Sequence, residues 1–409
     1  MRPASVRWPA ALSALFAARE PSRLFSLDVL RGVAIALVLL RHFPPSDIAP
    51  GGWLESAVHA IADIGGTGVD LFFVLSGFLI SGLIFKEYDR SGEFDARRFW
   101  IRRGYKIWPC YFAAYGGMTL ARLAWETIRG DYARVAQLAS GAACNSVFLQ
   151  NYLDCELWSH SWSLAVEEHF YSVFAIVAGA VCWFSARRKF DGARTFRFLV
   201  PTFVGVAVFA LYLRWQQCFP VYIDNGETAH SQSHLRMDGL LFGVFLSYLL
   251  RYRVTSIPGA LLRWPAVTLA LVLAFTWPTL WHTGRNPWYE SIGLTLMYLS
   301  FGVAVLAAAV NPQFGFDAPR PLNRLFRFLA WLGVYSYTVY LAHAVLFGFP
   351  GVETLRQGML ASVTPLIGET LALWADRIVY LLVAIVGGVA LSHAIERPFL
   401  RIRERRYAA

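Results

Sequence analysis

The sequence predicts an all-α integral membrane protein with about ten transmembrane helices and both termini in the cytoplasm. Two observations lead to this prediction: the composition of the chain and the alternation of charge between its loops. Of the 409 residues, 56% are hydrophobic and only 16% are charged, whereas soluble domains contain about 25% charged residues. The composition therefore excludes a soluble globular protein.

Apolar runs of about 17–22 residues, long enough to cross a bilayer core, recur along the chain. They lie near residues 27–43, 68–85, 106–125, 161–184, 196–213, 236–250, 264–281, 291–310, 328–349 and 377–395. Because these runs leave no room for a separate soluble unit, we expect one transmembrane domain over residues 26–400. Basic cytoplasmic tails are expected at residues 1–25 and 401–409, without a cleavable signal peptide or an appended soluble transferase domain.

The loops between these runs alternate in charge. A basic loop follows every even-numbered run, and the first of them, residues 86–103, carries six Lys and Arg side chains. By contrast, residues 44–67 carry three acidic side chains and no Lys or Arg. The positive-inside rule places the basic loops in the cytoplasm. The same rule accounts for the net charge of +10, so no nucleic-acid partner is expected.

The first run carries ionisable residues that are costly inside a membrane. Arg31 and His42 are eleven residues apart, so their side chains share one face of a helix and are separated by about 16 Å along its axis. The predicted topology places Arg31 near the cytoplasmic end and His42 near the outer end. Asp28 is expected to pair with Arg31, which is three residues further along the same helix. This helix predicts a polar path through the lipid.

The second and third runs contribute candidates for ligand binding. Small residues in the second run, among them Ser76, would admit a neighbouring helix or a ligand. Asp70 in the same run needs an ionic partner unless it lies in the outer water. Arg102, Arg103 and Lys106 lead into the third run among aromatic residues. These cations either set the topology or bind an anionic ligand such as a nucleotide phosphate, for which arginine is well suited.

The fourth run begins with the strongest candidate for a catalytic site. His160, Ser163, Glu167, Glu168 and His169 lie within ten residues, where intramembrane charges are costly. A carboxylate beside an imidazole orients the ring and raises its basicity. We therefore interpret this stretch as catalytic.

Three later features have both structural and functional interpretations. Arg236 and Asp238 open the sixth run, where they either pair with each other or line an outer cavity. His343 in the ninth run is interpreted first as a packing residue. Glu396 and Arg397 end the tenth run, where we expect a helix stop with an ion pair.

Together these motifs resemble the acyltransferase-3 family of membrane-bound O-acyltransferases, which includes enzymes that acetylate polysaccharides. The resemblance rests, in chain order, on Arg31 with His42, on Phe73–Ile80, on Arg102, Arg103, Lys106 and Pro109, on Trp162–Leu164 with Glu167, and on Glu396–Pro398. The family usually has arginine at the position of Lys106 and glutamine at the position of His169.

The resemblance implies an enzyme that moves an acyl group, usually acetyl, from acyl-CoA as co-substrate to an acceptor hydroxyl. We expect the CoA phosphates to bind at the cytoplasmic face and the pantetheine arm to reach outward to His42. There His42 is expected to act as a general base or a transient acyl carrier, and Glu167 to orient it. The implied catalytic residues are His42, Glu167, Arg31, His160 and Ser163. The implied donor-binding residues are Arg31, Ser76, Arg102, Arg103 and Lys106.

The acceptor is expected to be a saccharide, a glycolipid or a secreted small molecule at the outer side of a bacterial cytoplasmic (inner) membrane. A secondary transporter or flippase of a glycolipid or anionic substrate is the alternative, because buried Arg, Glu and His residues also suit transport. No metal-ligand spacing occurs in the sequence, so neither a metal nor a permanently bound cofactor is expected. Cys144 and Cys155 fall in a predicted outer loop, where a disulfide between them is one alternative.

Overall fold

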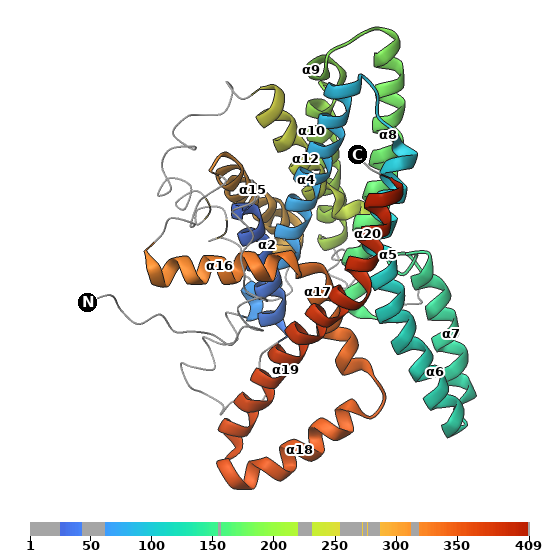
Figure 1. Cartoon of the computed structure of the whole chain (residues 1–409), viewed down its shortest axis with the longest axis vertical. Coiled ribbons are helices and arrows are strands. Elements are labelled where there is room, and N and C mark those ends of the chain that lie inside the picture. The colour runs from blue at the N-terminus through green and yellow to red at the C-terminus, as the bar shows by residue number, and fades with distance from the viewer. Residues whose placement is uncertain are drawn as a thin grey trace.

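The computed structural model describes residues 25–42, 62–153, 157–219, 231–253, 272, 276, 287–311 and 319–407. All regular structure within these residues is helical, as the sequence predicts (Figure 1). The first part of the chain forms α2 (Phe25–Arg41), α4 (Gly68–Ser91), α5 (Ala96–Tyr111), α6 (Gly117–Arg129), α7 (Tyr132–Ser146), α8 (Trp162–Arg187), α9 (Gly192–Thr195) and α10 (Leu199–Cys218). The second part forms α12 (Met237–Tyr252), α15 (Leu294–Val310), α16 (Arg320–Val334), α17 (Ser336–Val345), α18 (Val352–Ile367), α19 (Glu369–Leu391) and α20 (Arg397–Arg406).

Short turns of other helical types connect several of these helices. Three π-helical turns are η1 (Phe112–Gly116), η5 (Tyr289–Gly293) and η7 (Ser392–Glu396). Three 3₁₀ turns are η2 (Ser159–Ser161), η3 (Ser233–Leu235) and η6 (Leu346–Gly348). Since η7 joins α19 directly to α20, these two helices continue one another.

Five helices in the described part of the chain are long and apolar enough to cross a membrane. They are Ala62–Ser91, Trp162–Arg187, Gly192–Cys218, Tyr289–Val310 and Glu369–Arg406. Each overlaps one of the predicted runs, so the chain is a multi-pass membrane protein. The predicted run at residues 264–281 lies almost wholly outside the described residues. Ten spans and cytoplasmic termini stay predictions.

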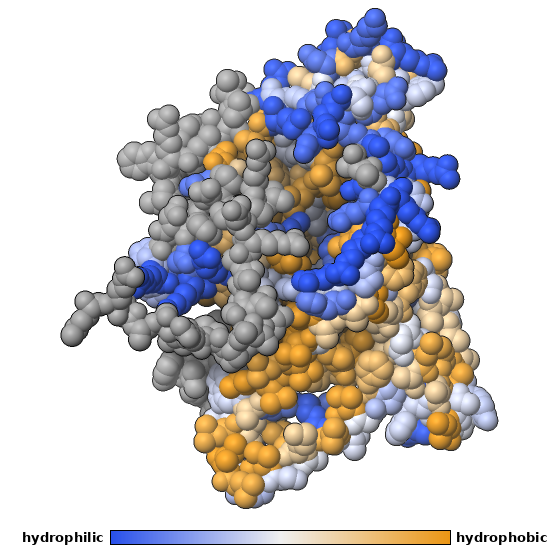
Figure 2. Space-filling view, in the orientation of Figure 1, coloured by the Kyte–Doolittle hydropathy of each residue, from blue (hydrophilic) through white to orange (hydrophobic). Residues whose placement is uncertain are grey.

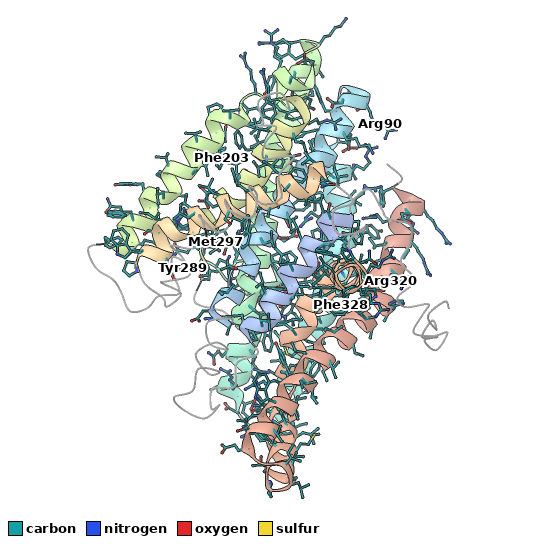
Figure 3. All side chains as sticks on the ribbon, turned by 90° about the vertical axis from the view of Figure 1, so that its left-hand side faces the viewer. Arg90, Phe203, Tyr289, Met297, Arg320 and Phe328 are labelled. Atoms are coloured by element: carbon teal, nitrogen blue, oxygen red, sulfur yellow. The ribbon has the colours of Figure 1, made fainter. Side chains whose placement is uncertain are left out.

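Residues from loops with the same predicted side can be compared in the structure. Figure 3 shows Arg90 and Arg320, from two loops predicted to be cytoplasmic, on the same side of the view. Tyr289, which precedes α15 at its predicted outer end, lies on the opposite side.

The predicted run at residues 328–349 is not one straight helix. Its two parts, α16 and α17, meet at an angle of 72° and would form a sixth span only if counted together. Figure 1 shows α16 running across the neighbouring helices. A Cβ atom on Gly333 of α16 would collide with the Asp28 carbonyl of α2, so only glycine permits this close crossing. Hydrophobic patterning did not predict the bend because the run is apolar on both sides of it, at residues 328–334 and 336–345.

The interior contains buried ion pairs that join separate helices. Arg236 binds Asp70 of α4 at 2.7 Å, and Asp238 binds Arg214 of α10 at 2.8 Å. Asp70 therefore has the ionic partner that the sequence required. Arg236 and Asp238 do not pair with each other, which corrects one of the two interpretations. Residues two positions apart point to different sides of a helical segment, so each meets a different neighbour.

The predicted helix stop at Glu396 and Arg397 is wrong. The helix continues through the π-helical turn η7 into α20, and Pro398 lies directly after this turn. Glu396 pairs with Lys106 of α5, and Arg397 donates to the Tyr335 hydroxyl at 2.6 Å. The expected local ion pair is thus replaced by contacts between helices.

Candidate active site

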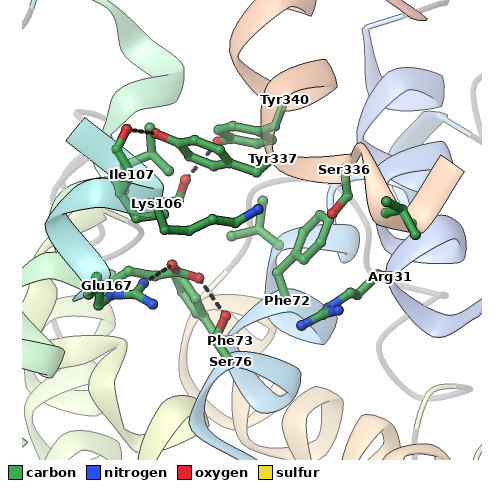
Figure 4. Close-up of a pocket in the computed structure, with 16 residues that line it drawn as sticks. Arg31, Phe72, Phe73, Ser76, Lys106, Ile107, Glu167, Ser336, Tyr337 and Tyr340 are labelled. Carbon is green, nitrogen blue, oxygen red and sulfur yellow. Dashed lines mark hydrogen bonds and ion pairs between the residues drawn. The ribbon is translucent and has the colours of Figure 1, made fainter. Parts of the chain in front are cut away.

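A cavity of about 190 Å³ lies between α2, α4, α5, α8, α16 and α17 (Figure 4). The helices that form it are far apart in the sequence and meet here because their small and apolar faces pack together. Six of the predicted site residues line this cavity: Arg31, Ser76, Arg103, Lys106, Ser163 and Glu167.

Glu167 connects three helices at the wall of the cavity. Its carboxylate accepts a hydrogen bond from the Ser76 hydroxyl at 2.9 Å and one from Arg103 at 3.3 Å. The Arg103 guanidinium also lies 3.8 Å from Glu168 and stacks 3.3 Å from the centre of the Tyr171 ring. These contacts hold α4 and α5 against α8.

The three cations that line the cavity are all paired with carboxylates. Arg31 binds Asp28 at 2.8 Å, which confirms the predicted pair on the first helix. Arg103 binds Glu167, and Lys106 binds Glu396 of η7. The wall is therefore polar but has little free positive charge.

Hydrogen bonds lead from the cavity toward a group of histidines. The Ser163 and Tyr340 hydroxyls, both on the cavity wall, are 2.6 Å apart. Tyr340 donates to the His160 carbonyl at 2.7 Å. The Tyr340 hydroxyl thus connects the cavity wall to the His160 backbone.

Three imidazole rings from three segments lie together beyond Tyr340. The His343 ring is 5.0 Å from that of His42 and 5.5 Å from that of His160, measured between ring centroids. The His42 Nδ1 lies 3.0 Å from the Val38 carbonyl. A carbonyl only accepts, so Nδ1 carries the proton and, in the neutral ring, Nε2 keeps its lone pair. His42 therefore presents a basic nitrogen at the end of α2.

A family model described as an acyltransferase domain matches residues 24–397. The chain belongs to the acyltransferase-3 family. No solved structure matches the chain significantly.

Two relatives from Staphylococcus aureus illustrate the membership in this family. One, from strain COL, bears a provisional O-acetyltransferase name and is 25% identical over 340 residues, which cover 79% of this chain and 50% of that protein. The other, O-acetyltransferase OatA of strain NCTC 8325, is 30% identical over 165 residues, which cover 39% of this chain and 25% of that protein. The chain therefore spans about half the length, or less, of these relatives.

The remaining predicted residues of this acyltransferase-3 chain lie outside the cavity lining. His42 and His160 belong to the histidine group, and Arg102 donates to the Tyr407 carbonyl beside α20. Glu167 binds Ser76 and Arg103, and no hydrogen bond or ion pair joins it to His42 in the described residues. The structure thus places the carboxylate at the cavity wall and not beside the imidazole that it was expected to orient.

Sequence reasoning missed the contribution of α17. Tyr337 and Tyr340 line the cavity, and Tyr337 donates to the Ile107 carbonyl of α5 at 2.7 Å. His343, which we interpreted as a packing residue, belongs to the histidine group. These residues recur every three positions, so they share one side of a short helix. That spacing was the signal available in the sequence.

Proposed function

We propose that this chain is a membrane O-acyltransferase that moves an acetyl group from acetyl-CoA on the cytoplasmic side to an acceptor hydroxyl on the outer side. Membership in the acyltransferase-3 family and the names of its O-acetyltransferase relatives support the reaction class. The observation that carries the proposal is the cavity that adjoins the histidine group through Tyr340. Such a cavity can hold a thioester near a base.

In the proposed reaction, His42 removes the proton from the acceptor hydroxyl through its Nε2. The hydroxyl oxygen attacks the thioester carbonyl carbon, a new C–O bond forms, and the C–S bond breaks. The proton then passes from His42 to the departing CoA thiolate, which leaves as the thiol. In a two-step variant, Nε2 attacks the thioester carbonyl carbon, the C–S bond breaks and the CoA thiolate leaves. The acceptor hydroxyl then attacks the acetyl carbon, the C–N bond breaks, and the hydroxyl proton goes to the thiolate.

The other residues position the two substrates in this proposal. The Ser163 hydroxyl donates to the thioester carbonyl, Tyr340 holds this wall against the His160 backbone, and His160 and His343 lie beside the His42 ring. Glu167 acts on the donor side, because it fixes Arg103 and Ser76 at the wall along which the donor passes. This role replaces the direct orientation of His42 that the sequence predicted.

The acceptor is proposed to be a saccharide, glycolipid or secreted small molecule, and the protein to reside in a bacterial cytoplasmic membrane. The test compares surface glycans and secreted products by mass spectrometry in a host whose gene has been deleted. Loss of the gene should remove the mass of one or more acetyl groups, and the wild-type gene should restore it.

The variant H42A tests the proposed role of His42, and H234A is its control. General acid–base groups contribute rate factors of about 10² to 10⁴, so H42A should fail to restore acetylation at equal protein level. His234 is an exposed histidine bonded to Tyr152, 3.1 Å away, and H234A should restore it fully. Full restoration by H42A would contradict the proposed mechanism, and unchanged masses on deletion would contradict the function.

A further inference from the structure

A groove of about 840 Å³ opens between α6 and α18, apart from the candidate active site. Its wall is formed by Trp125 of α6 and by the side of α18 that carries Leu355, Met359 and Val363. Figure 1 shows both helices at the end of the molecule opposite to α9, which lies in a predicted cytoplasmic loop. The groove is therefore on the predicted outer side, where the proposed reaction takes its acceptor.

The helices that form this groove present apolar side chains outward. Leu355 and Met359 of α18 are 65% and 58% exposed, and Ile128 of α6 is 83% exposed. Figure 2 shows apolar residues gathered over α18 and α19 on this face of the molecule. Apolar surface of this extent is unfavourable in water and fits hydrocarbon. In a membrane protein, the occupant that suits such a groove is the chain of a lipid.

A cationic side chain lies beside this groove. Arg122 lies one turn before Trp125 on α6. Its Nε donates to the Gly348 carbonyl at 2.7 Å, and Gly348 lies three residues before Gly351, which also lines the groove. Both partners in this hydrogen bond are therefore next to residues of the groove wall.

Arg122 keeps hydrogen-bond donors for a ligand. Within the part of the chain that the structure describes, only its Nε is hydrogen-bonded and its guanidinium forms no ion pair. The guanidinium lies 4.7 Å from the centre of the Trp158 ring. Trp158 is only 7% exposed, and its indole N–H is buried without a hydrogen-bond partner. A phosphate bound here would accept hydrogen bonds from both side chains and offset the charge of Arg122.

Arg122 and Trp158 adjoin the histidine group of the candidate active site. Trp158 lies two residues before His160 in the chain. The Tyr115 ring lies 6.3 Å from that of Trp158 and 5.6 Å from that of His160, measured between centroids. Gly348, which accepts the Arg122 hydrogen bond, follows His343 by five residues. A sugar attached to a phosphate at Arg122 would therefore extend toward the histidine group.

We propose that the groove binds the chain of a glycolipid acceptor whose sugar is joined to the chain through phosphate, and that Arg122 binds this phosphate. The inference rests on the proposed function and deepens it, because it selects a lipid-linked, anionic acceptor from the classes named there. Arg122 determines which acceptor binds and takes no part in the transfer of the acetyl group.

The test measures lipid binding to the full-length protein in detergent by native mass spectrometry. The probes are undecaprenyl phosphate and undecaprenol, which differ only in the phosphate. In R122Q, affinity for undecaprenyl phosphate should fall about tenfold, the effect of losing charge-assisted hydrogen bonds. Affinity for undecaprenol should not change. The matched control is R129Q, at an exposed arginine of the same helix, which should bind both lipids as the wild type does.

The variant G358F tests the part of the site that holds the chain. Nothing lies within 4 Å of a Cβ atom on Gly358, which lines the groove, so an added side chain occupies the groove without displacing α18. G358F should weaken the binding of both lipids to a similar extent. Its control is G205F in α10, where the added atom also meets nothing within 4 Å, and both lipids should bind it as they bind the wild type.

Three results would overturn the inference: no binding of either lipid to the wild type, unchanged affinity of R122Q for undecaprenyl phosphate, or an equal loss for undecaprenol in R122Q. Displacement of undecaprenyl phosphate by an equal concentration of dioleoylphosphatidylglycerol would also overturn it, because the groove would then hold membrane phospholipid. The acetyl groups lost on gene deletion test the proposed function separately. If they are lost while the lipid results fail, the proposed function stands without this site, and unchanged masses contradict the function whatever the lipid results.

Discussion

Ionisable residues inside this membrane protein are held by opposite charges from other helices. The pair of Arg236 and Asp70 is typical, with side chains that are only 2% and 6% exposed. Removing charges from water is costly, so such a pair adds little net stability, but a single charge left without its partner is strongly destabilising. Buried pairs therefore specify which helices lie side by side.

The variant D70N tests how much the buried pair of Asp70 and Arg236 matters for stability. The variant leaves the Arg236 guanidinium buried without its carboxylate, so we expect a loss of about 3–5 kcal/mol in stability. Thermal unfolding of the purified protein in detergent measures it. D70N/R236Q, which has no unpaired charge, should recover much of the loss. The control is D89N, in the exposed pair with Arg251, which should cost at most about 1 kcal/mol. An unfolding temperature of D70N equal to that of the wild type would contradict the expectation.

At the scale of elements, glycines set how closely the helices approach. A Cβ atom on Gly77 of α4 would collide with the Leu240 carbonyl of α12, and one on Gly243 of α12 would collide with the Val74 carbonyl of α4. The two glycines thus allow reciprocal backbone contact. This contact holds α4, which carries Ser76 at the cavity and Asp70 in the buried pair.

G77A should separate α4 from α12. The obstructing atom belongs to a backbone that cannot turn aside, so we expect a loss of about 1–3 kcal/mol, typical of overpacking. Thermal unfolding in detergent measures this loss. The matched control is G205A in α10, where nothing lies within 4 Å of the added atom. That variant should be neutral or gain up to about 1 kcal/mol from helix propensity. If both variants unfold at the same temperature, the close contact is not what holds the two helices.

At the scale of the whole molecule, the cavity is shared between distant parts of the chain. Its walls come from α2, α4, α5, α8, α16 and α17, and its neighbouring imidazoles lie toward the predicted outer side. The arginine-rich helix α20 lies toward the predicted cytoplasmic side. The proposed transfer of an acetyl group across the membrane depends on this orientation.

Cysteine labelling tests the orientation. Tyr132 lies in a predicted outer segment and is 71% exposed, and Arg188 lies in a predicted cytoplasmic loop and is also exposed. Y132C should react with a membrane-impermeant maleimide in intact cells, whereas R188C should react only after the membrane is opened. The native cysteines at 110, 182 and 218 are buried, which keeps the background low. Cys144 is disulfide-bonded, and its expected partner, Cys155, lies outside the described residues. If R188C reacted in intact cells and Y132C reacted only after the membrane is opened, the predicted topology would be wrong.

The sequence by itself determined what depends on local spacing. Apolar length predicted the helices that can span a membrane, and the loop charges predicted their direction. The pairing of Asp28 with Arg31 also followed, because residues three apart meet on any helix. Six of the residues predicted for the site line the cavity. Each was identified in the sequence because it is a polar group in an apolar run, where lipid would not tolerate it.

Only the tertiary structure decided which helices are neighbours. Lys106 meets Glu396, and Glu167 meets Arg103 and not His42. His343 joins the histidine group, and α16 turns away from α17. Helix periodicity specifies which side of a helix a residue occupies, but not which helix faces that side. That choice depends on close glycine contacts and charge pairs between segments that are hundreds of residues apart.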